Sequence, residues 1–267
     1  MTARSMVERQ FGPHAADYAR SQVHAKGESL ARLVALAQPR GHWRVLDVAT
    51  GAGHTALAFA PHVAEVVASD ITEEMLAETS RGAATKGCAN VTTARAHATL
   101  LPFADASFDA VVCRLAAHHF EQPAAFVSEA RRVLVPGGVL GLVDNVAPDA
   151  ESLPAASPDE LVAAGDHYNA FEHLRDPSHV RALTAAQWRA LVAAAGLEIS
   201  AEEVLTKELA FGPWVTRMSC DAATVERLRA LLHGGPGLLR GFLMPRTDGE
   251  GLHFSLRELI LVARRRR

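Results

Sequence analysis

The chain has 267 residues, of which 21% are charged and 49% hydrophobic, and its formal net charge at pH 7 is -3. This length is sufficient for a single α/β domain over 1–267 with insertions, while the charge provides no basic field for nucleic acid or an anionic membrane. The apolar runs are too short to cross a bilayer, and the N-terminal residues do not form a signal peptide. We therefore expect a cytoplasmic protein with no nucleic-acid partner and no membrane insertion. A homodimer is left open.

The first half of the chain alternates helical periodicity with short apolar strands. A helix is predicted over 21–38, ended by Pro39 and Gly41. Further helices are predicted over 55–60, 72–87 and 123–134, with Thr72 as the cap of the second. Strands are predicted over 44–48, 65–70, 91–95, 108–113 and 139–144. This alternation predicts a doubly wound parallel sheet, whose ligand lies beyond the C-terminal ends of the strands.

After residue 144 the alternation breaks. Prolines surround one helical stretch in 145–183, a helix is predicted over 184–195, and 211–251 is expected to be irregular and partly helical. Strands are predicted over 197–205 and 254–264, followed by a solvated arginine tail. Long ordered insertions in compact enzymes are usually functional. We therefore expect 1–38, 145–183 and 211–251 to form a cap and the substrate pocket, lined by His118, Tyr168, Phe171, His173, Arg175, Trp214 and Met218.

The segment VLDVATGAGH at 45–54 combines a buried strand, an acid and two glycines. Gly51 and Gly53 allow a tight turn and the close approach of a ligand, and a following helix start offers free N–H groups. The spacing matches a dinucleotide-binding turn, with Asp70 about twenty residues further on. Asp47 lies inside the turn, however, where a carboxylate would help a ligand carrying an ammonium or a sulfonium and would not help a phosphate.

This turn resembles the first motif of the class I S-adenosylmethionine-dependent methyltransferases, acid-x-x-x-Gly-x-Gly. Residues 101–109, LPFADASFD, and 132–138, RVLVPGG, are similar to the runs before strands four and five of that family. Within the class, the chain resembles the branch that contains ubiquinone and menaquinone C-methyltransferases and many small-molecule enzymes. The resemblance implies a Rossmann-like sheet of seven strands in the order 3-2-1-4-5-7-6, with strand 7 antiparallel.

The resemblance also implies a set of cofactor contacts. Asp70 would accept hydrogen bonds from both ribose hydroxyls, and Ile71 would cover the adenine. The family usually has an acid before Ala98, bonding the adenine amino group; here it is His97, whose imidazole can accept that bond only when neutral. The candidate cofactor residues are Tyr18 (as part of a lid), Asp47, Ala49, Gly51, Gly53, Asp70, Ile71, Met75, His97, Ala98, Arg114 and Leu115.

No metal site is expected. Asp144 and Asn145 resemble the metal-dependent catechol-type methyltransferases, but these also need an acid where Arg114 stands, and a cation beside a metal is costly. His119, on the rim after strand four, is the candidate catalytic base. Its neighbour His118 either faces the substrate or points toward the protein.

The sequence therefore predicts an enzyme that transfers a methyl group from S-adenosylmethionine to a small organic acceptor. Holding the two reactants in line, about 3 Å apart, can supply roughly 7–11 kcal/mol without any base. One alternative is a cyclisation or decarboxylation on the same cofactor fold. A non-catalytic cofactor-binding module is another. An NAD-dependent dehydrogenase is disfavoured by Asp47 and by the absence of a Tyr-x-x-x-Lys pair.

Overall fold

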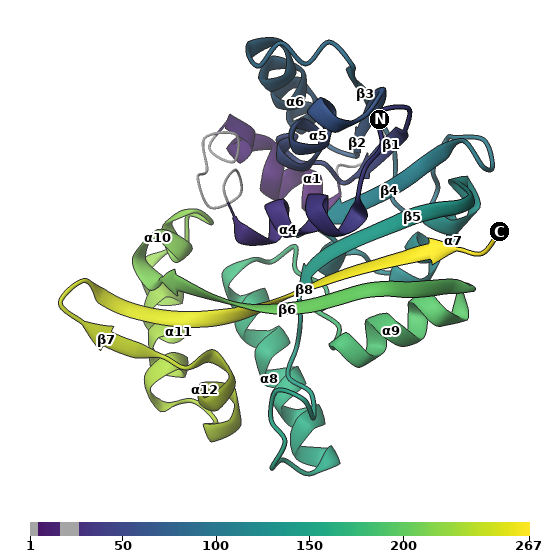
Figure 1. Cartoon of the computed structure of the whole chain (residues 1–267). Helices are drawn as coiled ribbons and strands as arrows, with labels where there is room; N and C mark the ends of the chain where they lie inside the picture. The colour runs from purple at the N-terminus through teal and green to yellow at the C-terminus, as the bar shows by residue number, and fades with distance from the viewer. Residues whose placement is uncertain (1–4, 17–26) are drawn as a thin grey trace.

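One mixed β-sheet runs through the whole chain (Figure 1), in a computed structural model that describes residues 5–16 and 27–267. The strand order is β3-β2-β1-β4-β5-β8-β6, and the short β7 pairs with β8. The strands are β1 (Arg44–Val48), β2 (Glu65–Asp70), β3 (Val91–Arg95), β4 (Phe108–Arg114), β5 (Leu134–Asn145), β6 (Leu197–Ala210), β7 (Arg246–Asp248) and β8 (Gly251–Arg265). β1 to β5 are parallel, whereas β8 is antiparallel to both β5 and β6. The predicted order and the antiparallel last strand are confirmed, with β7 as an addition.

Helices cover both faces of this sheet because successive side chains of each strand point to opposite faces. Val45 and Val66 join α4 and α5 in one core, while Leu46 and Val111 join α7 and α9 in the other. The helices and 3-10 turns are α1 (Met6–Phe11), η1 (Gly12–His14), α4 (Glu28–Ala37), α5 (His54–Phe59), η2 (Ala60–His62), α6 (Glu73–Thr85), η3 (Ala117–His119), α7 (Pro123–Val133), α8 (Pro158–Arg175), α9 (Ala185–Ala194), α10 (Phe211–Thr216), α11 (Ala222–Gly234) and α12 (Gly237–Leu243).

A third core lies where β6 and β8 extend past the rest of the sheet. There α8, α10, α11 and α12 gather around the strand ends (Figure 1), and their apolar side chains form one buried cluster. Phe171 stacks on Trp214 with ring centroids 5.2 Å apart. Tyr168 and Phe171 are fully buried in this cluster. The segment 211–251 therefore contains α10, α11, α12 and β7, and its helices share this third core with α8, β6 and β8. The segment is more ordered than the sequence predicts.

Two local predictions are corrected. β5 begins at Leu134 rather than at Val139, because the strand continues through the predicted turn at 136–138. Its pairing with β4 changes register there, between Phe108 and Ala110. Thr72 occupies the N-cap of α6, but its side chain makes no capping bond; its amide instead donates to Oδ1 of Asp70 at 2.8 Å.

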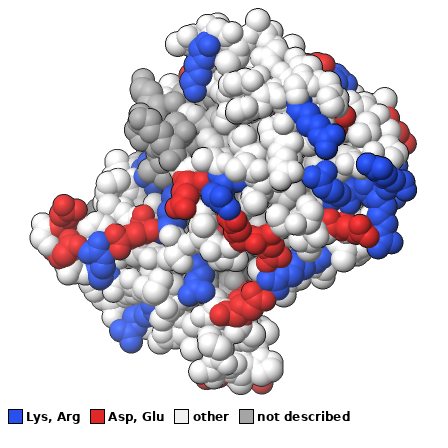
Figure 2. Space-filling view, viewed as in Figure 1, with Lys and Arg blue, Asp and Glu red and all other residues white. Residues whose placement is uncertain are grey.

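Charged side chains are interspersed on the face seen in Figure 2, with acidic and basic groups adjacent rather than separated into large patches. At the C-terminus, Arg266 and Arg267 are exposed as predicted, whereas Arg264 and Arg265 belong to β8. Within the described parts of the chain, no helix has both the length and the apolar character needed to cross a membrane.

Candidate active site

The loop between β1 and α5 is held by Asp47. Its side chain is 1% exposed, and Oδ2 accepts hydrogen bonds from Oγ1 of Thr50 at 2.5 Å and from the amide of Ala56 at 2.9 Å. Burial raises the pKa of Asp47 to about 7, against the two hydrogen bonds that lower it. Asp47 does not line the adjacent cavity. The structure thus places it as a brace between the loop and the helix N-terminus, and not against a ligand as the sequence suggested.

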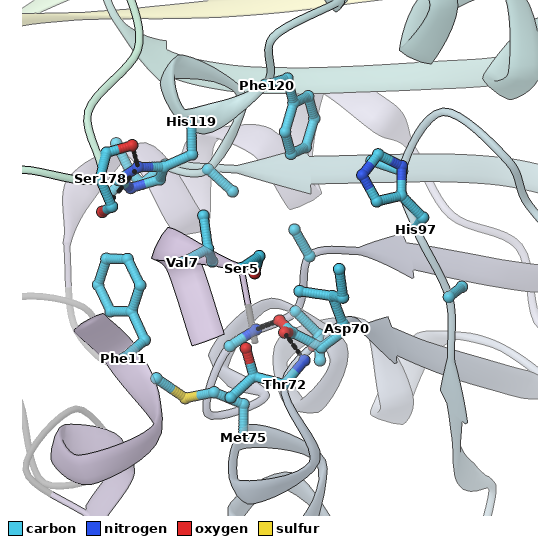
Figure 3. A pocket seen from close by; sticks show the side chains of 18 of the residues that line it. Ser5, Val7, Phe11, Asp70, Thr72, Met75, His97, His119, Phe120 and Ser178 are labelled. Carbon is cyan, nitrogen blue, oxygen red and sulfur yellow. Dashed lines mark hydrogen bonds between the residues drawn. The ribbon is translucent and has the colours of Figure 1, made fainter. Parts of the chain in front are cut away.

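A cavity of about 290 Å³ opens beyond the C-terminal ends of β1, β2 and β4 (Figure 3). Such a volume is close to the range of small-molecule sites. Ser5, Val7 and Phe11 close it from the N-terminal segment, and Ser178 and Val180 from the segment after α8. The predicted residues that line it are Ala49, Gly51, Asp70, Ile71, Met75, His97, Ala98, Arg114, Leu115 and His119. Gly53 lies behind the loop, outside the lining, and Tyr18 falls outside the described residues.

Asp70, at the end of β2, is 7% exposed and faces this cavity (Figure 3). Its Oδ2 accepts from the amide of Gly51 at 2.9 Å, and its Oδ1 accepts from the amide of Thr72. Burial raises its pKa, against these backbone bonds. Each carboxylate oxygen can accept a further bond, so Asp70 can receive a pair of hydroxyl donors from a ligand.

His97 lines the cavity in an orientation that changes its expected role. The amide of Thr99 donates to Nδ1 of His97 at 3.3 Å, and Oγ1 of Thr99 lies 2.9 Å from the same nitrogen. A neutral imidazole whose Nδ1 accepts carries its proton on Nε2. Nε2 is then a donor and cannot accept a bond from an amino group. The expected acceptor role of the neutral ring is not compatible with this orientation.

His118 and His119, in η3 after β4, have opposite environments. Nδ1 of His118 lies 2.6 Å from Oδ1 of the buried Asp144. Burial alone would lower the pKa of His118, but the Asp144 carboxylate outweighs it and the pKa is raised. His118 is thus directed toward β5. Nδ1 of His119 instead donates to the carbonyl of Ser178 at 2.9 Å (Figure 3).

This bond fixes the tautomer of His119, because a carbonyl oxygen can only accept. Nε2 of His119 therefore keeps its lone pair. The pKa of His119 is lowered to about 4, mainly by burial and secondly by the charge of the neighbouring His118. The ring of Phe11 contacts it edge-on, with centroids 5.1 Å apart. His119 is consequently a neutral imidazole at pH 7.

A second cavity of about 90 Å³ adjoins the first, since Phe11, Leu115 and His119 line both. Its other walls come from elements far apart in the sequence. They are His118, Asn145, Glu172, Arg175, Asp176, His179, Lys207, Leu209, Trp214, Arg217, Leu256 and Glu258. This cavity is mainly polar and charged, whereas the first is mainly apolar.

Comparison with known proteins identifies the family. Residues 46–142 match the family described as Methyltransferase domain. The uncharacterized methyltransferase YcgJ of Bacillus subtilis (strain 168) is 35% identical over 95% of this chain and 97% of its own length. The crystal structure of YcgJ superposes with a TM-score of 0.81 over 90% of this chain and 98% of that one, at 32% identity. Demethylmenaquinone methyltransferase of Thermus thermophilus is 38% identical over 42% of this chain and 52% of its own length.

The chain belongs to the class I S-adenosylmethionine-dependent methyltransferases. Its cofactor is S-adenosylmethionine, and the residues of the larger cavity fit that molecule. Asp70 offers carboxylate oxygens for a diol, and a Cβ on Gly51 would meet no protein atom within 4 Å, which leaves room for a ligand along the loop. Ala49 and Leu115 hold positive φ angles of 54° beside the same cavity. Strained non-glycine residues of this kind concentrate at functional sites.

The predicted substrate residues of this methyltransferase lie in three different environments. His118, Arg175 and Trp214 line the second cavity. Tyr168, Phe171 and Met218 are buried and line neither cavity, and Tyr168 and Phe171 belong to the third core. His173 also lies outside both linings, and its Nδ1 is 2.9 Å from the carbonyl of His179.

Sequence reasoning missed several residues of the second cavity, above all Glu172, Lys207 and Glu258. Glu172 follows Tyr168 by one helical turn on α8, a spacing that puts both on one face. Lys207 of β6 pairs with Glu258 of β8 at 2.6 Å, a contact that depends on the antiparallel register of two distant segments. Among the residues described, no group of three or more His, Cys, Asp and Glu could hold a metal ion.

Proposed function

We propose that this methyltransferase acts on a small organic acceptor, which meets the cofactor at His119. The observation that carries the proposal is the position of His119, which lines both the cofactor cavity and the polar cavity beside it. The polar cavity is the acceptor site in this proposal. Its small volume, about 90 Å³, favours a small molecule or a small reacting group over a macromolecular surface.

The cofactor supplies a sulfonium methyl group, which is already a strong electrophile. The protein holds the acceptor in line with that methyl and keeps water out, an effect worth roughly 7–11 kcal/mol. Phe11, Leu115 and Phe120 surround the site with apolar surface. Methyl transfer to the acceptor atom would leave the electron pair of the broken sulfur–carbon bond on the thioether product. Any proton that the acceptor loses passes to Nε2 of His119.

A base with a pKa of about 4 does not ionise a resting hydroxyl or amine. It can nevertheless take the proton of an acceptor whose acidity rises as the new bond forms. Because His119 stays neutral down to about pH 4, turnover should not fall between pH 8 and pH 6 through titration of this residue. A rate that falls tenfold per pH unit in that interval would argue against His119 as the proton acceptor.

The test has two stages. Calorimetry should detect binding of S-adenosylhomocysteine and no comparable binding of NAD. Transfer of a labelled methyl from S-adenosylmethionine to small-molecule fractions, read by mass spectrometry, then tests the acceptor class. Binding without methyl transfer to any fraction would favour a non-methylating reaction or a binding module.

Replacement of His119 separates base catalysis from positioning. His119→Ala should lower turnover by about 10²–10⁴-fold, the usual value of a general base, with S-adenosylhomocysteine affinity nearly unchanged. The control is His167→Ala, since His167 is exposed on α8 and lines neither cavity. Equal losses of turnover and cofactor affinity in His119→Ala would assign this residue to cofactor binding.

A further inference from the structure

We propose that Glu172 selects the acceptor, by binding a hydroxyl group of an electrically neutral molecule in the second cavity. This inference rests on the proposed function, since it names the substrate class of the same site. Glu172 lies on α8, is 5% exposed and lines the second cavity together with His119. Its Oε1 is buried and has no hydrogen-bond partner among the described residues.

Two further buried oxygens near Glu172 also lack a hydrogen bond within the described chain. They are Oη of Tyr168, one turn earlier on α8, and Oδ2 of Asp144 on β5. Both Glu172 and Asp144 act electrostatically on Tyr168, which places the three groups in one neighbourhood. Buried polar atoms almost always find a partner, and an unsatisfied one is destabilising. Of the three groups, only Glu172 lines the second cavity. An ionised carboxylate oxygen is an acceptor, so the partner that Glu172 lacks there is a donor.

The charges around Glu172 determine what kind of donor fits. Burial raises the pKa of Glu172, against the cations Arg175 and His118, which lower it, and the Asp144 carboxylate in turn raises the pKa of His118. Lys207 and Glu258 already neutralise each other. An ammonium would therefore add a cation beside two others and close to the sulfonium of the cofactor. Arg175 and Arg217 balance Glu172 and Asp176 on the lining of the same small cavity, so an added carboxylate would face two acids and leave the site with an excess negative charge.

A hydroxyl group donates a hydrogen bond to Glu172 without adding charge. Burying an unpaired charge is far more costly than burying a hydrogen-bonded neutral group. The apolar surface of Leu209, Trp214 and Leu256 on the same cavity suits the carbon skeleton that carries such a hydroxyl. The acceptor class is thus a neutral alcohol or phenol, bound with one hydroxyl at Glu172 and its reacting atom at His119.

The experiment uses matched probes on the full chain saturated with S-adenosylhomocysteine. Benzyl alcohol, toluene, benzylamine and benzoate share one ring and differ in charge and in the hydroxyl. Ligand-observed NMR should show benzyl alcohol binding with a Kd of about 1 mM, as expected for a fragment of this size. Toluene, benzylamine and benzoate should each bind about tenfold more weakly, the effect of one lost hydrogen bond or one added charge.

Glu172→Met tests the residue itself, because the apolar side chain is of similar size and has no oxygen that could accept a hydrogen bond. In this variant, the affinity for benzyl alcohol should fall about tenfold, to that for toluene. The control is Asp166→Asn, an exposed acid on the same helix that lines neither cavity.

The outcomes separate this inference from the function on which it rests. Benzylamine or benzoate binding as tightly as benzyl alcohol overturns the hydroxyl assignment, and so does benzyl alcohol binding no better than toluene. If Glu172→Met fails to fold, the four probes on the native chain still decide. Failure of the native chain to bind S-adenosylhomocysteine would instead refute the cofactor site and the proposed function.

Discussion

Gly51 and Gly53 lie in the same loop between β1 and α5, but replacing each by alanine should have a different effect. Gly51→Ala should mainly weaken cofactor binding, whereas Gly53→Ala should mainly lower the stability of the fold. Both residues have left-handed backbones, with φ of 55° and 84°, which costs a non-glycine residue about 1–2 kcal/mol. A Cβ on Gly51 meets no protein atom within 4 Å, and Gly51 lines the cofactor cavity. Gly51→Ala should therefore lose only about 1–2 kcal/mol of stability, while its methyl group occupies space that the cofactor needs.

Gly53→Ala has the opposite profile. Its Cβ would lie 2.7 Å from Cγ2 and 2.8 Å from Oγ1 of Thr79, and overpacking of this kind adds about 1–3 kcal/mol. Oγ1 of Thr79 donates to the carbonyl of Gly51 at 2.9 Å, so a displaced Thr79 also loosens the loop. We expect a total destabilisation of about 2–5 kcal/mol, which for a chain of this size lowers the Tm by about 2–4 °C per kcal/mol.

Urea unfolding and calorimetry with S-adenosylhomocysteine measure the two effects. Gly87→Ala is the control for backbone strain alone, because Gly87 has φ of 67°, no atom within 4 Å of its added Cβ and no place in the cavity lining. The double variant Gly53→Ala/Thr79→Ala should recover part of the lost stability, a coupling that a double-mutant cycle detects. Native cofactor affinity in Gly51→Ala, or a Gly53→Ala no less stable than Gly87→Ala, would refute the reasoning.

Four further predictions concern the site. Asp70→Ala should weaken S-adenosylhomocysteine binding by about 1–3 kcal/mol through unpaired polar groups; an unchanged calorimetric affinity would place the ribose elsewhere. The pKa of Asp47 rises on folding from 3.8 to about 7, so the folded chain binds this proton more tightly than the unfolded chain does. The free energy of unfolding should therefore fall as the pH rises between these two values, by up to about 1.4 kcal/mol per pH unit. Urea unfolding at pH 5 and pH 8 should show this loss of stability in the native chain and not in Asp47→Asn. The same change of unfolding free energy between the two pH values in both proteins would contradict the prediction. His97→Asp should tighten S-adenosylhomocysteine binding, since a carboxylate can accept from both the Thr99 amide and the adenine amino group; weaker binding would show that the donor at Nε2 is used. Cofactor should slow hydrogen exchange in α1 but not in α11, whose residues do not line the cavity, and equal protection of both would indicate a global effect.

The sequence alone determined the alternating half of the fold and the glycine turn at its centre. The strands 44–48, 65–70 and 91–95 were predicted to the residue, because short apolar runs bounded by polar residues specify buried strands locally. The motifs at 45–54, 101–109 and 132–138 carried the resemblance to the family, and that resemblance implied the strand order. Most of the predicted cofactor residues line the cavity because parallel strands end at one edge of the sheet.

Only the tertiary structure decided what individual polar side chains do. Asp47 has the sequence position of a ligand contact, yet its hydrogen bonds go to Thr50 and Ala56 in its own loop and helix. Tyr168 and Phe171 are aromatic and share α8 with Glu172, but they are buried in the third core and line neither cavity. The second cavity joins side chains of η3, α8, β6 and β8, and the bond from His119 to Ser178 spans 59 residues. Periodicity reports which face of an element is buried, whereas the partner of a polar atom depends on how distant elements dock, and that information is not local in the chain.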